Sequence, residues 1–188
     1  MMFRRFPYAA AVSWLLSVSA AFAQATTPAN PTSTLQLTSA TTAYSAGQLI
    51  ASSATAGSVV VPSFSISAQY RSAMIAGLRL AVADSTSTAW PAANVQIDLW
   101  SAAPTFNNGD RAAWSVATGS GGHLGAFSCT FSAFSGDGFY AECSPNVGNV
   151  RIPANIGTVY WTAQIAAGSS SGVTGASKVM TLTAEVLE

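Results

Sequence analysis

The chain has 188 residues, of which 49% are hydrophobic and only 7% are charged, and its formal net charge at pH 7 is zero. Charged residues ordinarily make up about a quarter of a soluble domain, so hydroxyl and amide groups must supply most of the polar surface here. No cluster of basic residues is present that could bind a phosphate backbone, so a partner of the nucleic-acid class is not expected.

The first residues have the pattern of a secretory signal peptide. Arg4 and Arg5 precede an apolar run over residues 9–18, and a small-residue cleavage site follows at residues 21–23. The apolar run is too short to remain as a membrane-spanning helix. We therefore expect cleavage after Ala23, a secreted, periplasmic or cell-surface location, and no stable membrane anchor in the mature chain.

The next segment, residues 24–34, is polar and contains Pro28 and Pro31, which is typical of a flexible leader. Order is expected to begin near Leu35. Residues 35–188 are enough for a single domain with a sizeable core.

Apolar and polar residues alternate repeatedly within residues 35–188, which is the pattern of half-buried β-strands. Clusters of Gly, Ser, Thr, Pro and Asn separate these stretches, and no amphipathic helical period is present after the leader. The pattern predicts an all-β domain, a two-sheet β-sandwich of the jelly-roll kind with eight to ten antiparallel strands. The expected strands lie at residues 35–37, 44–51, 63–68, 74–82, 95–100, 112–116, 127–133, 139–144, 159–165 and 180–186.

The strongest local prediction is a β-hairpin that carries both cysteines. Apolar and polar residues alternate on either side of residues 135–138, whose glycines allow a tight turn. If Cys129 faces Cys143, Phe131 lies opposite Ala141 and both sulfur atoms share the apolar face. Facing Cα atoms in such a pair lie about 4.5–5.5 Å apart, a distance that a disulfide spans. We therefore expect a cross-strand disulfide, which agrees with export to an oxidising compartment.

The chain contains no recognisable catalytic or metal-binding motif. His123 is the single histidine, and no G-x-S-x-G elbow accompanies it, so it is expected to be a solvent-facing turn residue. The carboxylates are scattered singly, so a glycosidase pair could arise only through the fold. Asn107, Asn108 and Asp110 offer oxygen ligands of the type that calcium prefers, but their spacing favours a turn. We expect no enzyme activity, no cofactor and no bound metal.

Aromatic residues are the candidates for a binding surface. Trp90, Trp100, Trp114, Tyr140 and Tyr160 lie in predicted loops or on predicted outer faces of strands. Exposed rings can stack on sugar rings or dock a protein partner. The alternative is that loops cover one face of the sandwich and that these rings form a second, smaller core.

Five short motifs lie in the predicted domain: YSAGQ at 44–48, IAGLRL at 75–80, IDLW at 97–100, NGDRAAW at 108–114 and VYW at 159–161. In these motifs the chain resembles small phage virion proteins, the jelly-roll or sandwich proteins that decorate capsids or form head and tail fibres. The resemblance brings no catalytic motif with it. The predicted signal peptide departs from that group, whose members assemble in the cytoplasm without a leader.

Together these features predict an exported, non-catalytic structural or interaction module at a cell or particle surface. Protein partners or self-association are expected. The alternative is a carbohydrate-binding module that uses the exposed aromatic residues, and an enzyme is the third reading.

Overall fold

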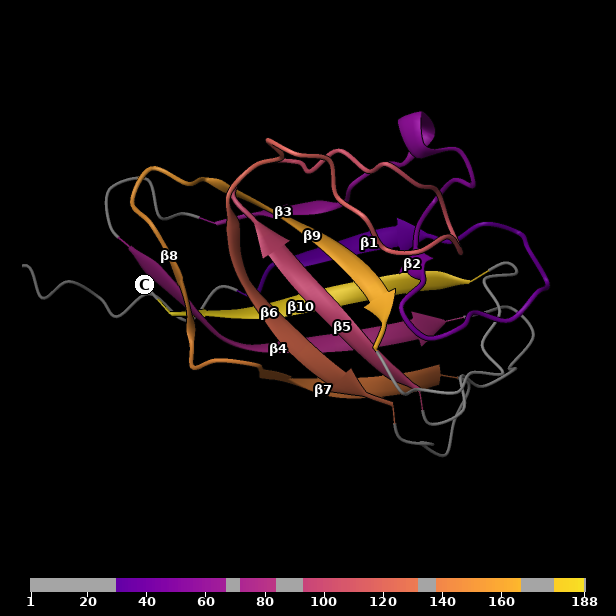
Figure 1. Ribbon diagram of the computed structural model, residues 1–188. Coiled ribbons are helices and arrows are strands. Elements are labelled where there is room, and N and C mark those ends of the chain that lie inside the picture. Colours follow the sequence, from indigo (N-terminus) through magenta and orange to yellow (C-terminus); the bar gives the residue numbers. More distant parts are fainter. Residues whose placement is uncertain (1–29, 67–71, 84–92, 132–137, 167–177, 188) are drawn as a thin grey trace, which may run out of the picture.

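A computed structural model shows a domain built almost entirely of β-strands (Figure 1). The only helical element among the described residues is a single 3-10 turn, Ala56–Ser58, and none of these residues forms a helix long and apolar enough to cross a bilayer. The all-β prediction is therefore confirmed. The structure describes residues 30–66, 72–83, 93–131, 138–166 and 178–187.

The described residues form ten strands, all paired antiparallel, in one sheet with the order β1-β10-β4-β7-β6-β5-β9-β2, and β3 is also paired to β9 and β8 to β4. Residues 112–116 were expected to form a strand, but they make only isolated bridges, such as Gln48 with Ala113. The strands are β1 (Thr32–Gln36), β2 (Leu49–Ile50), β3 (Ser63–Ser65), β4 (Ala73–Ala83), β5 (Asn94–Trp100), β6 (His123–Thr130), β7 (Gly138–Pro145), β8 (Val150–Ile152), β9 (Thr158–Ile165) and β10 (Val179–Leu187).

The first strand begins N-terminal to the expected boundary at Leu35. β1 starts at Thr32, and its buried residues are Ser33 and Leu35. Because Ser33 is polar, the hydrophobic pattern did not indicate that it is buried. Its hydroxyl can be buried because it accepts a hydrogen bond of 3.0 Å from Nε1 of Trp161 in β9. The leader expected over residues 24–34 therefore overlaps the start of the sheet.

The sheet curls so that β5, β6 and β9 lie across β1, β10 and β4 (Figure 1). Hydrogen bonds between β6 and β7 join the two halves, so the sheet is continuous where two separate sheets were expected. The core fills the space between the halves. Its large, fully buried side chains include Phe127, Phe131, Ile75, Leu80, Ile97, Leu99, Ile152 and Trp161.

The predicted hairpin forms the junction between the halves. Cys129 lies opposite Cys143 in the register, their Cα atoms are 4.1 Å apart and their sulfur atoms are bonded at 2.07 Å, as the sequence predicted. The expected pairing of Phe131 with Ala141 is not formed. The backbone N–H of Phe131 donates to the carbonyl of Ala93 instead, and Ala141 pairs with Leu80 of β4. The two strands of the hairpin separate beyond the disulfide because β6 stays paired with β5 and β7 stays paired with β4. The predicted turn lies outside the described residues.

We predict that replacing Cys129 and Cys143 together with alanine lowers the free energy of unfolding by about 3 kcal/mol, because the crosslink restricts the unfolded chain. Urea unfolding of the oxidised and doubly substituted proteins measures the difference. Wild type held under a thiol reductant is the control and should approach the variant. Peptide mapping without reduction should recover the two cysteines joined, and free thiols in the purified protein would contradict the register.

Candidate functional site

A groove of about 310 Å³ lies on the outer face of β4, β7 and β10, and we call it the Arg79 groove. Strand alternation places its side chains: the neighbours Leu78 and Leu80 point into the core, so Gly77 and Arg79 face outward. β7 contributes Glu142, β10 contributes Thr183 and Glu185, and Asn30 borders the groove just before β1. Three strands and a terminal segment that are distant in sequence therefore meet here.

The register of the strands sets the arrangement of the groove. Thr183, Arg79 and Glu142 lie side by side in one row across β10, β4 and β7, and Glu185 lies opposite Gly77 in the adjacent row. Because Gly77 has no side chain, the surface is lowered beside Arg79. A Cβ atom built on Gly77 would make an ordinary contact of 3.5 Å with Oε2 of Glu185, so a small side chain fits there without strain.

The groove contains one positive and two negative side chains. Arg79 Nε lies 3.3 Å from Glu142 Oε1, and these side chains are 55% and 79% exposed. An ion pair this exposed contributes about 0–1 kcal/mol, so its groups can exchange water for another ligand at little cost. Within the described part of the chain, the carboxylate of Glu185 makes no hydrogen bond or ion pair.

Tyr140 is the predicted aromatic residue that lies on this face. It is 42% exposed, and the guanidinium carbon of Arg79 lies 4.5 Å from the centre of its ring. A cation over an aromatic ring is attracted to it by about 0.5–1 kcal/mol at an exposed site. Tyr140 thus helps to hold Arg79 over the outer face of β4 and β7.

Trp100 and Trp114 belong to a second core and are not a free binding surface. Their rings stack with centroids 6.4 Å apart, and Trp100 is only 6% exposed, with Nε1 donating to Thr162 Oγ1 at 3.1 Å. Trp114 lies in the segment that connects β5 to β6, and it packs on an apolar cluster that is smaller than the main core. This cluster, the minor core, consists of Leu49, Ala51 and Phe106 with Val59, Val61, Trp114 and Val116.

The other two predicted aromatic residues add little to a binding surface. Tyr160 is half-buried on β9, where the register places it between Ser63 of β3 and Trp100 of β5. Trp90 lies outside the described residues. Of the predicted aromatic residues, Trp114 therefore packs on the minor core and Trp100 is buried beside it.

A buried carboxylate beside Trp100 is a feature that the sequence analysis missed. Nε2 of Gln96 donates to both oxygens of Asp98 at 3.1 Å, Nε2 of Gln164 donates at 3.4 Å, and Nε2 of His123 lies 3.0 Å from Oδ1. His123 is exposed, as expected of a solvent-facing residue, but it begins β6 and does not lie in a turn, and its ring contacts that of Trp100 edge-on at 4.9 Å. The alternation of Gln96, Asp98 and Trp100 on one face of β5 was the available signal.

The Asn107–Asp110 turn forms a structural anchor. The Asp110 carboxylate accepts hydrogen bonds from the hydroxyls of Tyr44 and Thr38 and from the backbone N–H of Ala51, and it lies 3.6 Å from Arg111 Nε. Its oxygens are thus engaged by the chain itself, which supports the turn over the cation site. Among the described residues no group of three metal-ligating side chains comes together.

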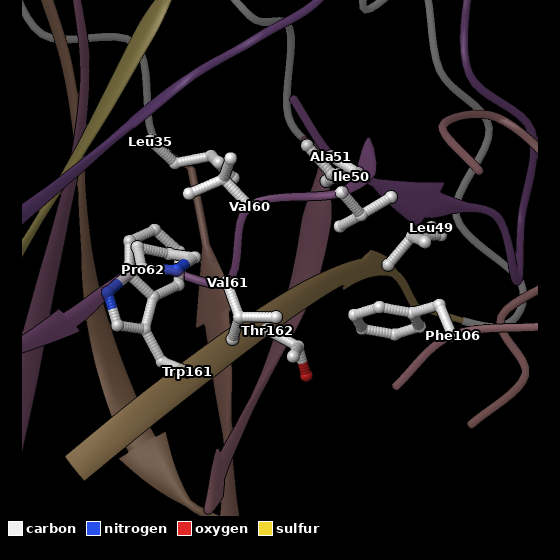
Figure 2. A pocket seen from close by; sticks show the side chains of 11 residues that line it. Leu35, Leu49, Ile50, Ala51, Val60, Val61, Pro62, Phe106, Trp161 and Thr162 are labelled. Atoms are coloured by element: carbon white, nitrogen blue, oxygen red, sulfur yellow. The ribbon is translucent and has the colours of Figure 1, made fainter. Parts of the chain in front are cut away.

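An apolar cavity lies between the edge strands, where the minor core meets the main core (Figure 2). Leu35 and Val60 border it on one side, Phe106 on the other, and Trp161 lies below Pro62 in this view. Its volume is about 10 Å³, enough for a single water molecule at most. The cavity is a packing gap and is too small for an organic ligand.

Comparison with known proteins found no matching family model, no matching curated protein and no matching solved structure. The resemblance to phage virion proteins therefore stays a prediction, and the functional argument depends on the chain's own geometry.

We predict that Trp100→Ala and Tyr140→Ala have very different effects on stability. Truncating the buried Trp100 should lower the free energy of unfolding by about 3–5 kcal/mol, because it leaves a cavity beneath Trp114. Truncating the exposed Tyr140 should change it by about 0.5 kcal/mol or less. Urea unfolding followed by circular dichroism compares the variants, and similar losses in both would contradict the assignment of Trp100 to a second core.

We also predict that the protein loses stability in alkaline solution through Tyr44. Burial, reinforced by the neighbouring Asp110 carboxylate, raises the pKa of this phenol above its ordinary value. The unfolded chain releases the proton near pH 10 while the folded chain keeps it, so the contribution of Tyr44 is intact below about pH 10 and declines above it by about 1.4 kcal/mol per pH unit.

The measurement is the free energy of unfolding from urea titrations between neutral and strongly alkaline pH. Tyr44→Phe is the control: it should be less stable than wild type at neutral pH by about 1 kcal/mol, since a hydrogen bond to Asp110 is lost. Its alkaline decline should be shallower than that of wild type. Parallel curves for the two proteins would show that Tyr44 is not responsible.

Proposed function

We propose that the protein is an exported, non-catalytic interaction module that binds a partner at a cell or particle surface through the outer face of β4, β7 and β10. The observation that carries this proposal is the Arg79 groove, in which donors and acceptors from three adjacent strands face solvent around the Gly77 depression. Side chains held by paired strands are positioned more precisely than side chains on loops.

The position of the face within the sheet supports the proposal. β4 is paired along both of its edges, to β10 on one side and to β7 on the other, so Arg79 and Gly77 stand on an interior strand rather than on a free edge. The disulfide braces this part of the sheet from the core side, because Cys143 of β7 is buried and its residue borders the groove. A rigid platform of this kind loses little conformational freedom on binding.

Carbohydrate binding is the second candidate function, and the structure changes the residues that would serve it. The indole rings of Trp100 and Trp114 are packed in or against the minor core. Among the predicted aromatic residues that the structure describes, the ring that remains exposed is that of Tyr140, which lies on the same face as the Arg79 groove. Both candidate functions therefore use one surface.

We predict that Arg79→Glu reduces retention of the exported protein on the envelope or particle fraction of the producing cells by about tenfold, which corresponds to about 1.4 kcal/mol of binding free energy. The substitution places a third carboxylate beside those of Glu142 and Glu185. It also removes the Arg79 guanidinium, whose several N–H groups can donate hydrogen bonds to a partner. The measurement is the bound fraction after washing, quantified by immunoblot against the total exported protein.

Arg151→Glu is the matched control, because Arg151 is also an exposed arginine on a strand, β8, but lies outside the groove, where its guanidinium donates to Ser72 Oγ at 3.2 Å. This variant should be retained like wild type. Equal retention of Arg79→Glu and wild type would refute the proposed binding face.

A further inference from the structure

We propose that the ligand of the Arg79 groove is a neutral sugar residue that presents neighbouring hydroxyl groups, an inference that rests on the binding role proposed above for the same face. The volume is the first argument. Small-molecule sites occupy about 300–1,000 Å³, and the groove, at about 310 Å³, lies at the lower end of that range. The groove has room for one sugar unit of an oligosaccharide, whose other units would extend over the exposed surface around the groove.

The mixture of donors and acceptors is the second argument. Glu142 and Glu185 are acceptors, the Arg79 guanidinium is a donor, and Asn30 and Thr183 can do both. A sugar hydroxyl both donates and accepts, so adjacent hydroxyls can donate to a carboxylate and accept from the guanidinium at the same time. Such charge-assisted hydrogen bonds are roughly twice as strong as neutral ones.

The charges disfavour the other ligand classes. A phosphate or carboxylate group would enter between Glu142 and Glu185, where like charges repel. A basic side chain would meet Arg79, which occupies the centre of the row between Thr183 and Glu142. A neutral ligand avoids both repulsions and leaves the Arg79–Glu142 pair in place.

Tyr140 has a positioning role in this arrangement. The Arg79 guanidinium lies over its ring, so the ring restricts the orientations that Arg79 can adopt. Arg79 is anchored on its other side by Glu142 at 3.3 Å. With both contacts, the guanidinium is oriented before a ligand arrives, which lowers the entropy lost on binding.

The test measures binding of the mature protein to cellohexaose, maltohexaose, xylohexaose and mannohexaose by saturation-transfer NMR and isothermal titration calorimetry. We expect saturation transfer to at least one of these sugars. Gly77→Val should weaken that binding by about tenfold, because its side chain fills the depression beside Glu185. Ser65→Val is the matched control: it places the same β-branched side chain at an exposed strand position, in β3, outside the groove, and should bind like wild type.

Thermal unfolding of both variants establishes that they fold, and both should melt close to wild type. Two results would overturn the sugar assignment: no saturation transfer to any of the four oligosaccharides, or equal affinity in Gly77→Val and wild type. If Arg79→Glu still loses surface retention in that case, the face binds a protein and only the sugar inference fails. If retention is unchanged as well, the proposed function fails with it.

Discussion

The disulfide between Cys129 and Cys143 marks the point at which the two halves of the curled sheet are joined. On one side of this crosslink β6 and β7 are paired, and on the other side β6 continues with β5 while β7 continues with β4. Without a fixed junction the two strands could separate further, and the core between the halves would open. The crosslink therefore ties the two halves together at the point where they diverge.

A second constraint holds the long connection between β5 and β6 against the sheet. Asp110 is buried, and its carboxylate binds Tyr44, Thr38 and the backbone of Ala51, groups that come from the N-terminal third of the chain. Gly109 is required next to it, because a side chain there would collide with the backbone of Ala54. This anchor brings Trp114 over Trp100 and closes the minor core, which explains why two tryptophans on an outer face are not available for binding.

The two outer faces of the sheet consequently have different roles. The face of β5 and β9 is covered, and its polar residues are satisfied among themselves around Asp98. No such cover over the face of β4, β7 and β10 is formed by the described residues: Arg79, Glu142 and Tyr140 are exposed there, and Gly77 leaves a depression. The polar groups that remain open to a partner are therefore concentrated on one half of the molecule. The binding that we propose at this face would need no rearrangement of the core, since it involves only outward side chains.

The amino-acid sequence by itself determined the all-β class, the inward and outward faces of most strands and the pairing of Cys129 with Cys143, because period-two alternation and cysteine spacing are local properties of a strand. It did not reveal the buried Ser33 or the Asp98–His123 contact, since a polar residue looks exposed until its partner strand is known. Only the tertiary structure brought Gly77, Glu142 and Glu185 to one groove and placed Trp114 over Trp100. These arrangements depend on which strands become neighbours and where a connecting segment folds back, and both are decided by contacts between residues far apart in the chain.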